Sequence, residues 1–222
     1  MLAGQRQSAE CAAALEKLCS AYWMPIYGFA RRKGHGDADA KDLTQQFFSV
    51  LLERDDFAGL DPKRGKFRTF LLTAFTHFLA NEIDRSRTIK RGGGKAMLSF
   101  NELSEEQRAR YEPATEGSAA KMYDVQWAQA ILERALGRLS DEQGGKAAQF
   151  AELKKFLTAD ANSSAYAAAA QKLDVADSSV PVLVHRLRHR YRELVRAEVA
   201  QTVSSPTELE EEMRHLFDVL NQ

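Results

Sequence analysis

The sequence has little of what marks secreted, disulfide-stabilised or membrane proteins. It contains two cysteines among 222 residues. Cys11 and Cys19 have no CxxC or Cys/His spacing, so we expect neither a disulfide framework nor a zinc site. No apolar run approaches the roughly 20 residues that a membrane span needs. The N-terminus lacks the cationic start and apolar core of a secretory signal, and we therefore expect a cytoplasmic protein.

Catalytic signatures are also missing from the sequence. The pairs Gly94-Lys95 and Gly145-Lys146 are each followed by Ala and lack a glycine five positions earlier, which excludes a phosphate-binding loop. No HExxH, GxSxG or zinc-deaminase pattern occurs, and the five histidines have no metal-ligand spacing. We therefore expect a protein that is not an enzyme and uses no cofactor.

A net excess of one charge is absent, but the two signs are segregated along the chain. Residues 61–95 contain nine Lys/Arg and three Asp/Glu, whereas residues 201–222 contain one and five. Residues 37–56 and 96–124 are acidic overall. Basic blocks can neutralise phosphates and release counterions, while acidic blocks have to face protein or solvent.

Strand signals are nearly absent, so the sequence predicts an all-α fold. Apolar residues recur at helical spacing in residues 8–94 and 125–200, which predicts two small helical domains. Residues 95–124 are rich in Gly, Pro, Ser and Glu and predict an acidic flexible linker, with one short helix over Ser104 to Arg110. An acidic amphipathic helix is expected in a C-terminal extension, residues 201–222.

Proline and glycine place the expected helix boundaries in the first domain. Pro25 suits the first position of a second helix, after one over residues 8–22, and Asp37 or Asp39 can cap a third. A long helix is expected to begin at Phe67 and to end at three consecutive glycines. Its predicted core residues are Phe67, Phe70, Leu71, Ala74, Phe78 and Ile83.

Two features of the first domain are candidate binding surfaces. Asp42, Gln45 and Gln46 recur at i, i+3 and i+4 beside an apolar stripe, which suits docking of a protein, although simple solvation would produce the same pattern. The long helix combines phenylalanines with cations at both ends. Aromatic rings beside a basic end can hold unstacked single-stranded bases. We expect most of these phenylalanines to be core and the cations to carry nucleic-acid binding.

The second domain has the spacing of a helix-turn-helix. An Ala-rich helix over residues 164–173, a short turn and a basic helix over residues 180–199 follow one another, as in DNA-binding motifs. The basic helix has an apolar stripe flanked by Arg and His, and Arg can bond guanine bidentately or clamp phosphates. A surface helix with merely solvated cations is the alternative. The preceding helix and turn favour DNA binding.

Together these segments resemble an extracytoplasmic-function sigma factor of the sigma-70 family, in particular the variant common in Planctomycetes. The segment DAKDLTQQFFSVLLER, residues 39–54, resembles the family's Asp-x-x-Gln-Glu-x-Phe helix. This resemblance implies that Asp42, Gln45 and Gln46 dock on the coiled coil of the RNA polymerase β′ subunit. The family usually has Glu where this chain has Gln46, which weakens one charge contact.

Two further segments resemble the DNA-binding parts of such a factor. Residues 61–94 resemble the segment that opens and reads the promoter minus-ten element. The DNA contacts implied there, by position, are Asp61, Lys63, Arg64, Arg68, His77, Asn81, Arg85, Arg87, Lys90 and Arg91. Residues 126–197 resemble sigma region four, which reads the minus-thirty-five element. The contacts implied there are Ser178, Ser179, His185, Arg186, Arg188 and His189.

The turn and the start of the basic helix depart from the family pattern. Asp174 stands where relatives usually have Gly, and Asp tolerates a left-handed turn better than most residues. We expect Asp177 or Ser178 to cap the helix, and Pro181, near its fourth position, to remove a backbone donor. The next two residues are apolar at positions that are often polar in relatives, so direct base reading falls to the residues around them.

The resemblance implies two partners: core RNA polymerase, contacted through its β′ coiled coil and β flap, and promoter DNA. An anti-sigma factor is a further expected partner, a membrane is not, and the free chain is expected to be a monomer. A stand-alone helix-turn-helix regulator that acts without polymerase is the alternative function, and an adaptor that acts through its acidic tail is a third. The charge segregation also suggests that the acidic linker and tail cover the basic DNA surfaces until polymerase binds.

Overall fold

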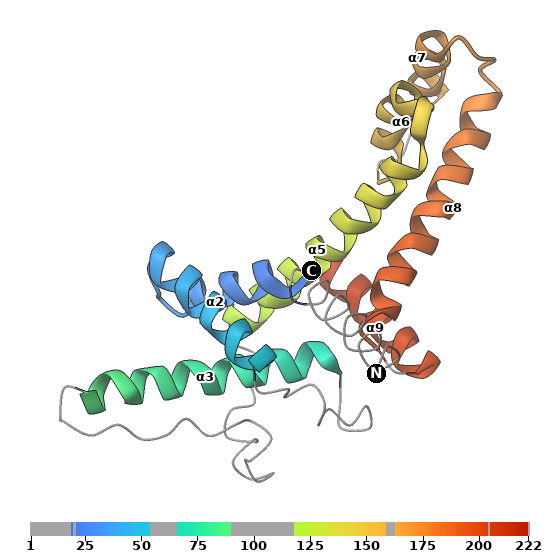
Figure 1. Cartoon of the computed structure of the whole chain (residues 1–222). Coiled ribbons are helices and arrows are strands. Elements are labelled where there is room, and N and C mark those ends of the chain that lie inside the picture. The colour runs from blue at the N-terminus through green and yellow to red at the C-terminus, as the bar shows by residue number, and fades with distance from the viewer. Residues whose placement is uncertain are drawn as a thin grey trace, which may run out of the picture. The chain divides into compact units, whose positions relative to one another are not determined.

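The computed structural model describes residues 19, 21–53, 66–89, 118–158, 163–203 and 205–221. Over these ranges the chain is helical and contains no β-strand, which confirms the predicted all-α class. A helix covers residues 21–32. The later elements are α2 (Asp37–Glu53), α3 (Phe67–Ile89), α5 (Ser118–Glu142), η3 (Gly144–Lys146), α6 (Ala147–Leu153), η4 (Lys154–Phe156), α7 (Ser163–Leu173), α8 (Ser179–Ala200) and α9 (Pro206–Leu220) (Figure 1). Within the described ranges, no helix has the length and hydrophobicity to cross a membrane.

The fold divides into two compact units. Unit 1 comprises Met1–Ala130 and Thr202–Gln222, and unit 2 comprises Ile131–Gln201. The acidic C-terminal extension therefore groups with the first part of the chain. Residues 118–124 are the first turns of α5, although their composition predicted linker, and the short helix expected over Ser104 to Arg110 lies outside the described residues.

The core of unit 1 contains interlocking aromatic side chains. The ring of Phe75 on α3 lies 5.0 Å from the ring of Phe47 on α2 and 6.1 Å from that of Phe29 on the helix over residues 21–32. Phe78 is also buried. Spacing of i, i+3 and i+4 brings such residues to one face of each amphipathic helix, and this face is buried. The prediction that these phenylalanines are core is therefore confirmed for Phe75 and Phe78.

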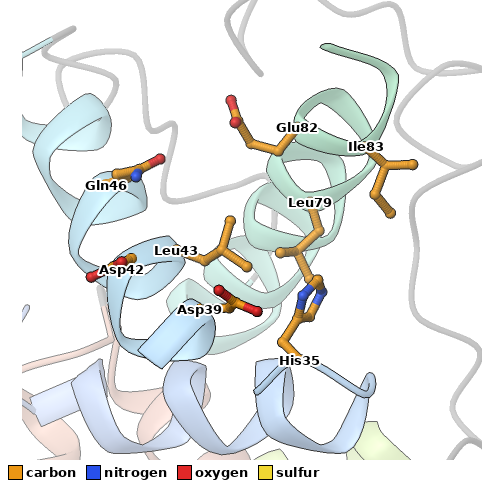
Figure 2. Close-up of a pocket in the computed structure, with 8 residues that line it drawn as sticks. All are labelled: His35, Asp39, Asp42, Leu43, Gln46, Leu79, Glu82 and Ile83. Atoms are coloured by element: carbon orange, nitrogen blue, oxygen red, sulfur yellow. The ribbon is translucent and has the colours of Figure 1, made fainter. Parts of the chain in front are cut away.

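Two details of unit 1 differ from the sequence prediction. Residues 21–32 are continuously helical through Pro25, which was expected to begin a new helix. Ile83 was expected in the core, but 44% of its surface is exposed. Ile83 lies in the second half of α3, on the side away from α2 in Figure 2, and is one of the lining residues of the pocket described below. The apolar periodicity of α3 thus continues beyond the part of the helix that is buried.

Unit 2 is built from the second half of α5 with α6, α7 and α8. The helices α6 and α7 pack against α8 (Figure 1). The small residues Ala169 and Ala170 of α7 are fully buried, as are Val180 and Val184 of α8. Alanine allows close approach of two helix backbones, so the Ala-rich composition of α7 supports this tight pair.

Candidate protein-docking and nucleic-acid surfaces

A surface pocket of about 340 Å³ lies between α2 and α3 in unit 1. Its lining side chains are drawn in Figure 2 and are His35, Asp39, Asp42, Leu43, Gln46, Leu79, Glu82 and Ile83. Leu43 of α2 and Leu79 of α3 point toward one another between the two helices (Figure 2). Asp42 and Gln46, which were predicted to share one docking edge, both belong to this lining.

Helical spacing explains why α2 contributes so much of the pocket. Asp39, Asp42 and Gln46 recur at i, i+3 and i+7 and so lie along one edge of the helix. All three are exposed, whereas Leu43 beside them is half-buried. Gln45, predicted to act with them, is exposed on the same helix, but among the described residues it is outside the pocket lining.

The pocket combines an apolar floor with an acidic rim. Leu43 and Leu79, which lie between the two helices, supply the floor, and Ile83 adds an exposed apolar side chain. The carboxylates of Asp39 and Glu82 join that of Asp42 at the rim. Protein interfaces commonly pair a desolvated apolar centre with polar groups around it, and complementary charge then selects the partner. This lining therefore suits a protein segment that presents apolar residues between basic ones.

The start of α2 is fastened to the preceding helix. The Tyr27 hydroxyl donates a 2.6 Å hydrogen bond to the Asp37 carboxylate, and Lys41 Nζ lies 2.9 Å from the same group. The hydrogen bond from Tyr27 and the pairing with Lys41 lower the pKa of Asp37. One turn later, buried Thr44 donates a 2.7 Å bond to the carbonyl of Ala40. The pocket edge is thus carried on an anchored helix.

The residues implied to contact the minus-ten element have varied positions in the structure. Asp61, Lys63, Arg64, Lys90 and Arg91 lie outside the described residues. Arg85 and Arg87 belong to the last turns of α3, where the backbone alone is described. The described side chains are those of Arg68, His77 and Asn81. Arg68 and His77 are not on the open surface that the resemblance implied.

Arg68 lies on the buried side of α3. Its side chain is 11% exposed, because residues 68, 71 and 75 recur at i, i+3 and i+7 and Leu71 and Phe75 are core. The guanidinium pairs with the Asp124 carboxylate of α5 and lies 3.2 Å from Glu212 of α9. Burial opposes the charge of Arg68, but the two carboxylates outweigh it and raise the pKa of Arg68.

His77 is also buried, with 5% of its surface exposed. Desolvation lowers the pKa of His77, because burial penalises the protonated ring. The Nδ2 atom of half-buried Asn81 lies 3.2 Å from His77 Nε2. Two of the residues that the resemblance implied as minus-ten DNA contacts thus contact one another, one turn apart on α3.

An ion-pair cluster in unit 1 joins three elements around Arg68. Glu212, whose side chain is 2% exposed, lies 3.1 Å from Lys66 Nζ as well as 3.2 Å from Arg68 Nε. The Arg68 guanidinium also lies over the Trp127 ring, 5.1 Å from its centroid. The Tyr123 hydroxyl donates a 3.0 Å bond to the backbone carbonyl of Arg68. Burial raises the pKa of Tyr123 well above its usual range, so this donor stays protonated.

The turn between α7 and α8 in unit 2 contains the left-handed residue that was predicted for it. Asp174 has a φ of 52°, in the left-handed region that glycine adopts more readily than other residues. The amide of Val175 donates a 3.1 Å bond back to the carbonyl of Ala170, which closes the end of α7. The turn over residues 174–178 then leads directly into α8.

The start of α8 corrects two expectations. Ser178 is the N-cap residue, but its side chain makes no capping hydrogen bond. Pro181 is the third residue of α8, so it lies within the first turn, whose amides have no acceptor inside the helix. The missing N–H of Pro181 therefore removes no hydrogen bond from α8.

Four side chains form an exposed face on α8. Val182, His185, Arg186 and His189 recur at i, i+3, i+4 and i+7, and all are exposed. His189 Nδ1 lies 3.5 Å from the Glu193 carboxylate. This face, called the α8 surface below, presents an arginine and two histidines around one apolar residue.

The other predicted contacts of α8 lie apart from this face or are engaged elsewhere. Ser178 is exposed and Ser179 is half-buried at the helix start. Arg188 is half-buried, and its Nε donates a 2.8 Å bond to the carbonyl of Phe156. Arg190 lies 2.7 Å from Glu142 and 2.8 Å from Glu193. Arg188 and Arg190 of α8 therefore bind acceptors within unit 2.

Buried carboxylates are the residues that the sequence prediction missed. Glu198 of α8 is 4% exposed and accepts bonds of 2.9 Å from Arg134 and 2.7 Å from Arg138 of α5. Glu212 of α9 is likewise buried and pairs with Lys66 and Arg68. The sequence contains a signal for both acids, because Glu198 lies four residues after Leu194 and Glu212 four residues before Leu216, and both leucines belong to the apolar stripe of their helix.

Comparison with family models, curated proteins and solved structures finds no match to this chain. In the part of the chain that the structure describes, no group of three or more His, Cys, Asp or Glu is placed to hold a metal ion. The surfaces that remain as candidate sites are the acidic-rimmed pocket and the α8 surface.

Proposed function

We propose that the protein is a sigma factor that binds core RNA polymerase and directs promoter-specific initiation by recognising and melting promoter DNA. The observation that carries the proposal is the pocket between α2 and α3. Asp42 and Gln46 of the segment that resembles the core-binding helix line this pocket, beside an apolar floor. A stand-alone DNA-binding protein has no need of such a docking surface.

In this proposal the pocket of unit 1 receives the coiled coil of the polymerase β′ subunit. The apolar floor is desolvated on binding, and the three rim carboxylates face basic residues of the partner. Gln46 provides a hydrogen bond where relatives place a charge. Catalysis of RNA synthesis belongs to polymerase, and the chain supplies positioning and promoter choice in the cytoplasm.

The α8 surface supports a second, duplex-binding role at the minus-thirty-five element. Arg186 can bond a guanine edge or a phosphate, and His185 and His189 flank it. Val182, at 49% exposure, offers apolar contact where a polar base reader would otherwise stand. This composition favours positioning of the protein on DNA over detailed sequence reading. Single-stranded minus-ten DNA binds to the cationic segment around α3 and stabilises the open promoter.

Run-off transcription with core polymerase tests the proposal, on a promoter identified by mapping transcript starts after overexpression. The wild-type chain is expected to give a specific transcript and Asp42→Lys to reduce it at least about tenfold, since a reversed charge meets basic partner residues. Asp141→Lys, at an exposed acid of α5, is the matched control and should transcribe normally. A wild-type chain that neither binds core polymerase nor supports a specific transcript sinks the proposal.

A stand-alone helix-turn-helix regulator remains the second candidate, favoured by the exposed α8 surface taken alone. The two functions differ in their dependence on the pocket. For a sigma factor, Asp42→Lys strongly reduces transcription and leaves duplex binding by α8 intact. A chain that controls a promoter equally well with and without a functional pocket is a regulator of the second kind.

A further inference from the structure

We infer that α9 is an autoinhibitory latch. Its Glu212 pairs with the cations at the start of α3, and this pairing has to break before that end of the helix can bind nucleic acid. The inference rests on the proposed function, because it names the regulation of the same DNA-binding segment. The carboxylate of Glu212 takes the place that a DNA phosphate would take. The latch closes within unit 1, since both helices belong to it.

The contacts of Glu212 single out this carboxylate from the other acids of α9. Glu212 lies 3.1 Å from Lys66 Nζ and 3.2 Å from Arg68 Nε, and its side chain is 2% exposed. Its neighbour Glu211, 43% exposed, lies 3.4 Å from the same Lys66 nitrogen. Two consecutive acids of the C-terminal helix thus neutralise the first two described cations of the basic block.

The surroundings of this ion pair form a fitted seat for α9. Leu216, one turn after Glu212, is fully buried, and the His215 ring lies 5.9 Å from the Trp127 ring. His215 Nε2 also lies 3.5 Å from Asp124, the second carboxylate that holds Arg68. Apolar burial and charge pairing therefore act at the same place.

The first turn of α9 is capped by its own residues. Ser205 is an extended N-cap residue that accepts a 3.2 Å bond from the amide of Glu208, and Pro206 occupies the first helical position. Phe217 and Leu220 on α9 stay exposed. The contacts that tie α9 to the cations are thus side-chain contacts, which can open without unfolding its capped first turn.

A latched cation cannot pair with a phosphate at the same time, so α9 and nucleic acid compete for Lys66 and Arg68. Polymerase or single-stranded promoter DNA shifts the balance toward the open state by binding that state more tightly. The free chain is then a weak nucleic-acid binder, although its segment 61–95 is rich in cations. Opening of α9 is what couples assembly with polymerase to DNA binding.

The first test measures the affinity of the full-length free chain for a fluorescent single-stranded oligonucleotide by anisotropy. Glu212→Gln removes the charge with little change of shape, and we expect it to bind about tenfold more tightly than wild type. Asp218→Asn makes the same change of net charge at an exposed position of α9 and should alter affinity by less than about twofold. Equal affinities of the two variants overturn the latch.

The second test needs no variant and so does not depend on the folding of Glu212→Gln. Hydrogen exchange of the amides of residues 206–220 is compared in the wild-type chain alone and in its transcribing complex with core polymerase and promoter DNA. The latch predicts faster exchange in the complex, because a 15-residue helix released from its tertiary contacts is only marginally stable and opens more often. Unchanged or slower exchange in a complex that makes the specific transcript overturns the latch and leaves the sigma-factor proposal standing, whereas a chain that supports no transcript refutes the sigma-factor proposal and the latch with it.

Discussion

The arginines Arg68 and Arg186 begin from the same expectation and end in opposite environments. Both were predicted to contact promoter DNA, one on α3 of unit 1 and one on α8 of unit 2. Arg68 is 11% exposed between two carboxylates, whereas Arg186 is exposed on the α8 surface. A basic segment therefore shows where positive charges lie along the chain. Which of these cations face solvent depends on where the acidic residues lie in the fold.

The largest expected difference between the two arginines is in stability. Arg68→Met leaves Glu212 and Asp124 buried without their partner, and removal of one member of a buried pair costs roughly 3–5 kcal/mol. Arg186→Met changes an exposed residue and should alter the free energy of unfolding by less than about 0.5 kcal/mol. Urea denaturation of both variants measures this difference. Equal destabilisation would mean that the Arg68 cluster contributes nothing beyond a surface charge.

The next difference lies within α8, between an arginine of the α8 surface and one that is paired. Arg186→Ala should weaken binding to a minus-thirty-five duplex by about 1–3 kcal/mol, the usual value of a specific arginine contact. Arg190→Ala should cost less than about 1 kcal/mol, because Arg190 is already engaged by Glu142 and Glu193. Titration at one fixed salt concentration compares them, and a larger loss for Arg190 would place the DNA surface on the other side of α8.

The smallest expected effect is the pH dependence contributed by His77. Burial lowers the pKa of His77 below its ordinary value of 6.5, so the unfolded chain takes up a proton more readily than the folded one. The stabilisation is complete above about pH 6.5 and declines as the pH falls below that value. His77→Gln should flatten this decline in urea midpoints between about pH 7.5 and about pH 5.5. An equally steep decline in the variant would assign it to other groups.

Local sequence rules predicted the helices and one unusual backbone position. Capping residues, glycines and apolar spacing placed α2, α3, α7 and α8 within a few residues of their observed bounds. The left-handed conformation at Asp174 also followed from residue type, because few non-glycine residues tolerate it. These features depend on interactions within one or two turns, which a sequence displays directly.

Such local rules could not predict contacts between residues that are far apart in the sequence. Asp42 and Gln46 could be assigned to one helix edge, but the pocket also needs Glu82 and Ile83 from α3, and nothing in local spacing pairs those helices. Arg68 was predicted to be exposed on the basis of its charge, although its spacing from Leu71 and Phe75 places it on the apolar face of α3. Its carboxylate partner Glu212 is 144 positions away in the chain, so the pairing depends on the folded state of unit 1.

Trp127 gives the protein an internal optical reporter of α9. Its indole ring lies 5.1 Å from the Arg68 guanidinium and 5.9 Å from the His215 ring of α9, so we expect the emission of Trp127 to depend on whether α9 is seated. The chain has only one other tryptophan, Trp23, which stacks on Tyr27. In a Trp23→Phe chain, a single fluorophore would therefore follow the movement of α9 in real time, on the microsecond to second scale of such rearrangements.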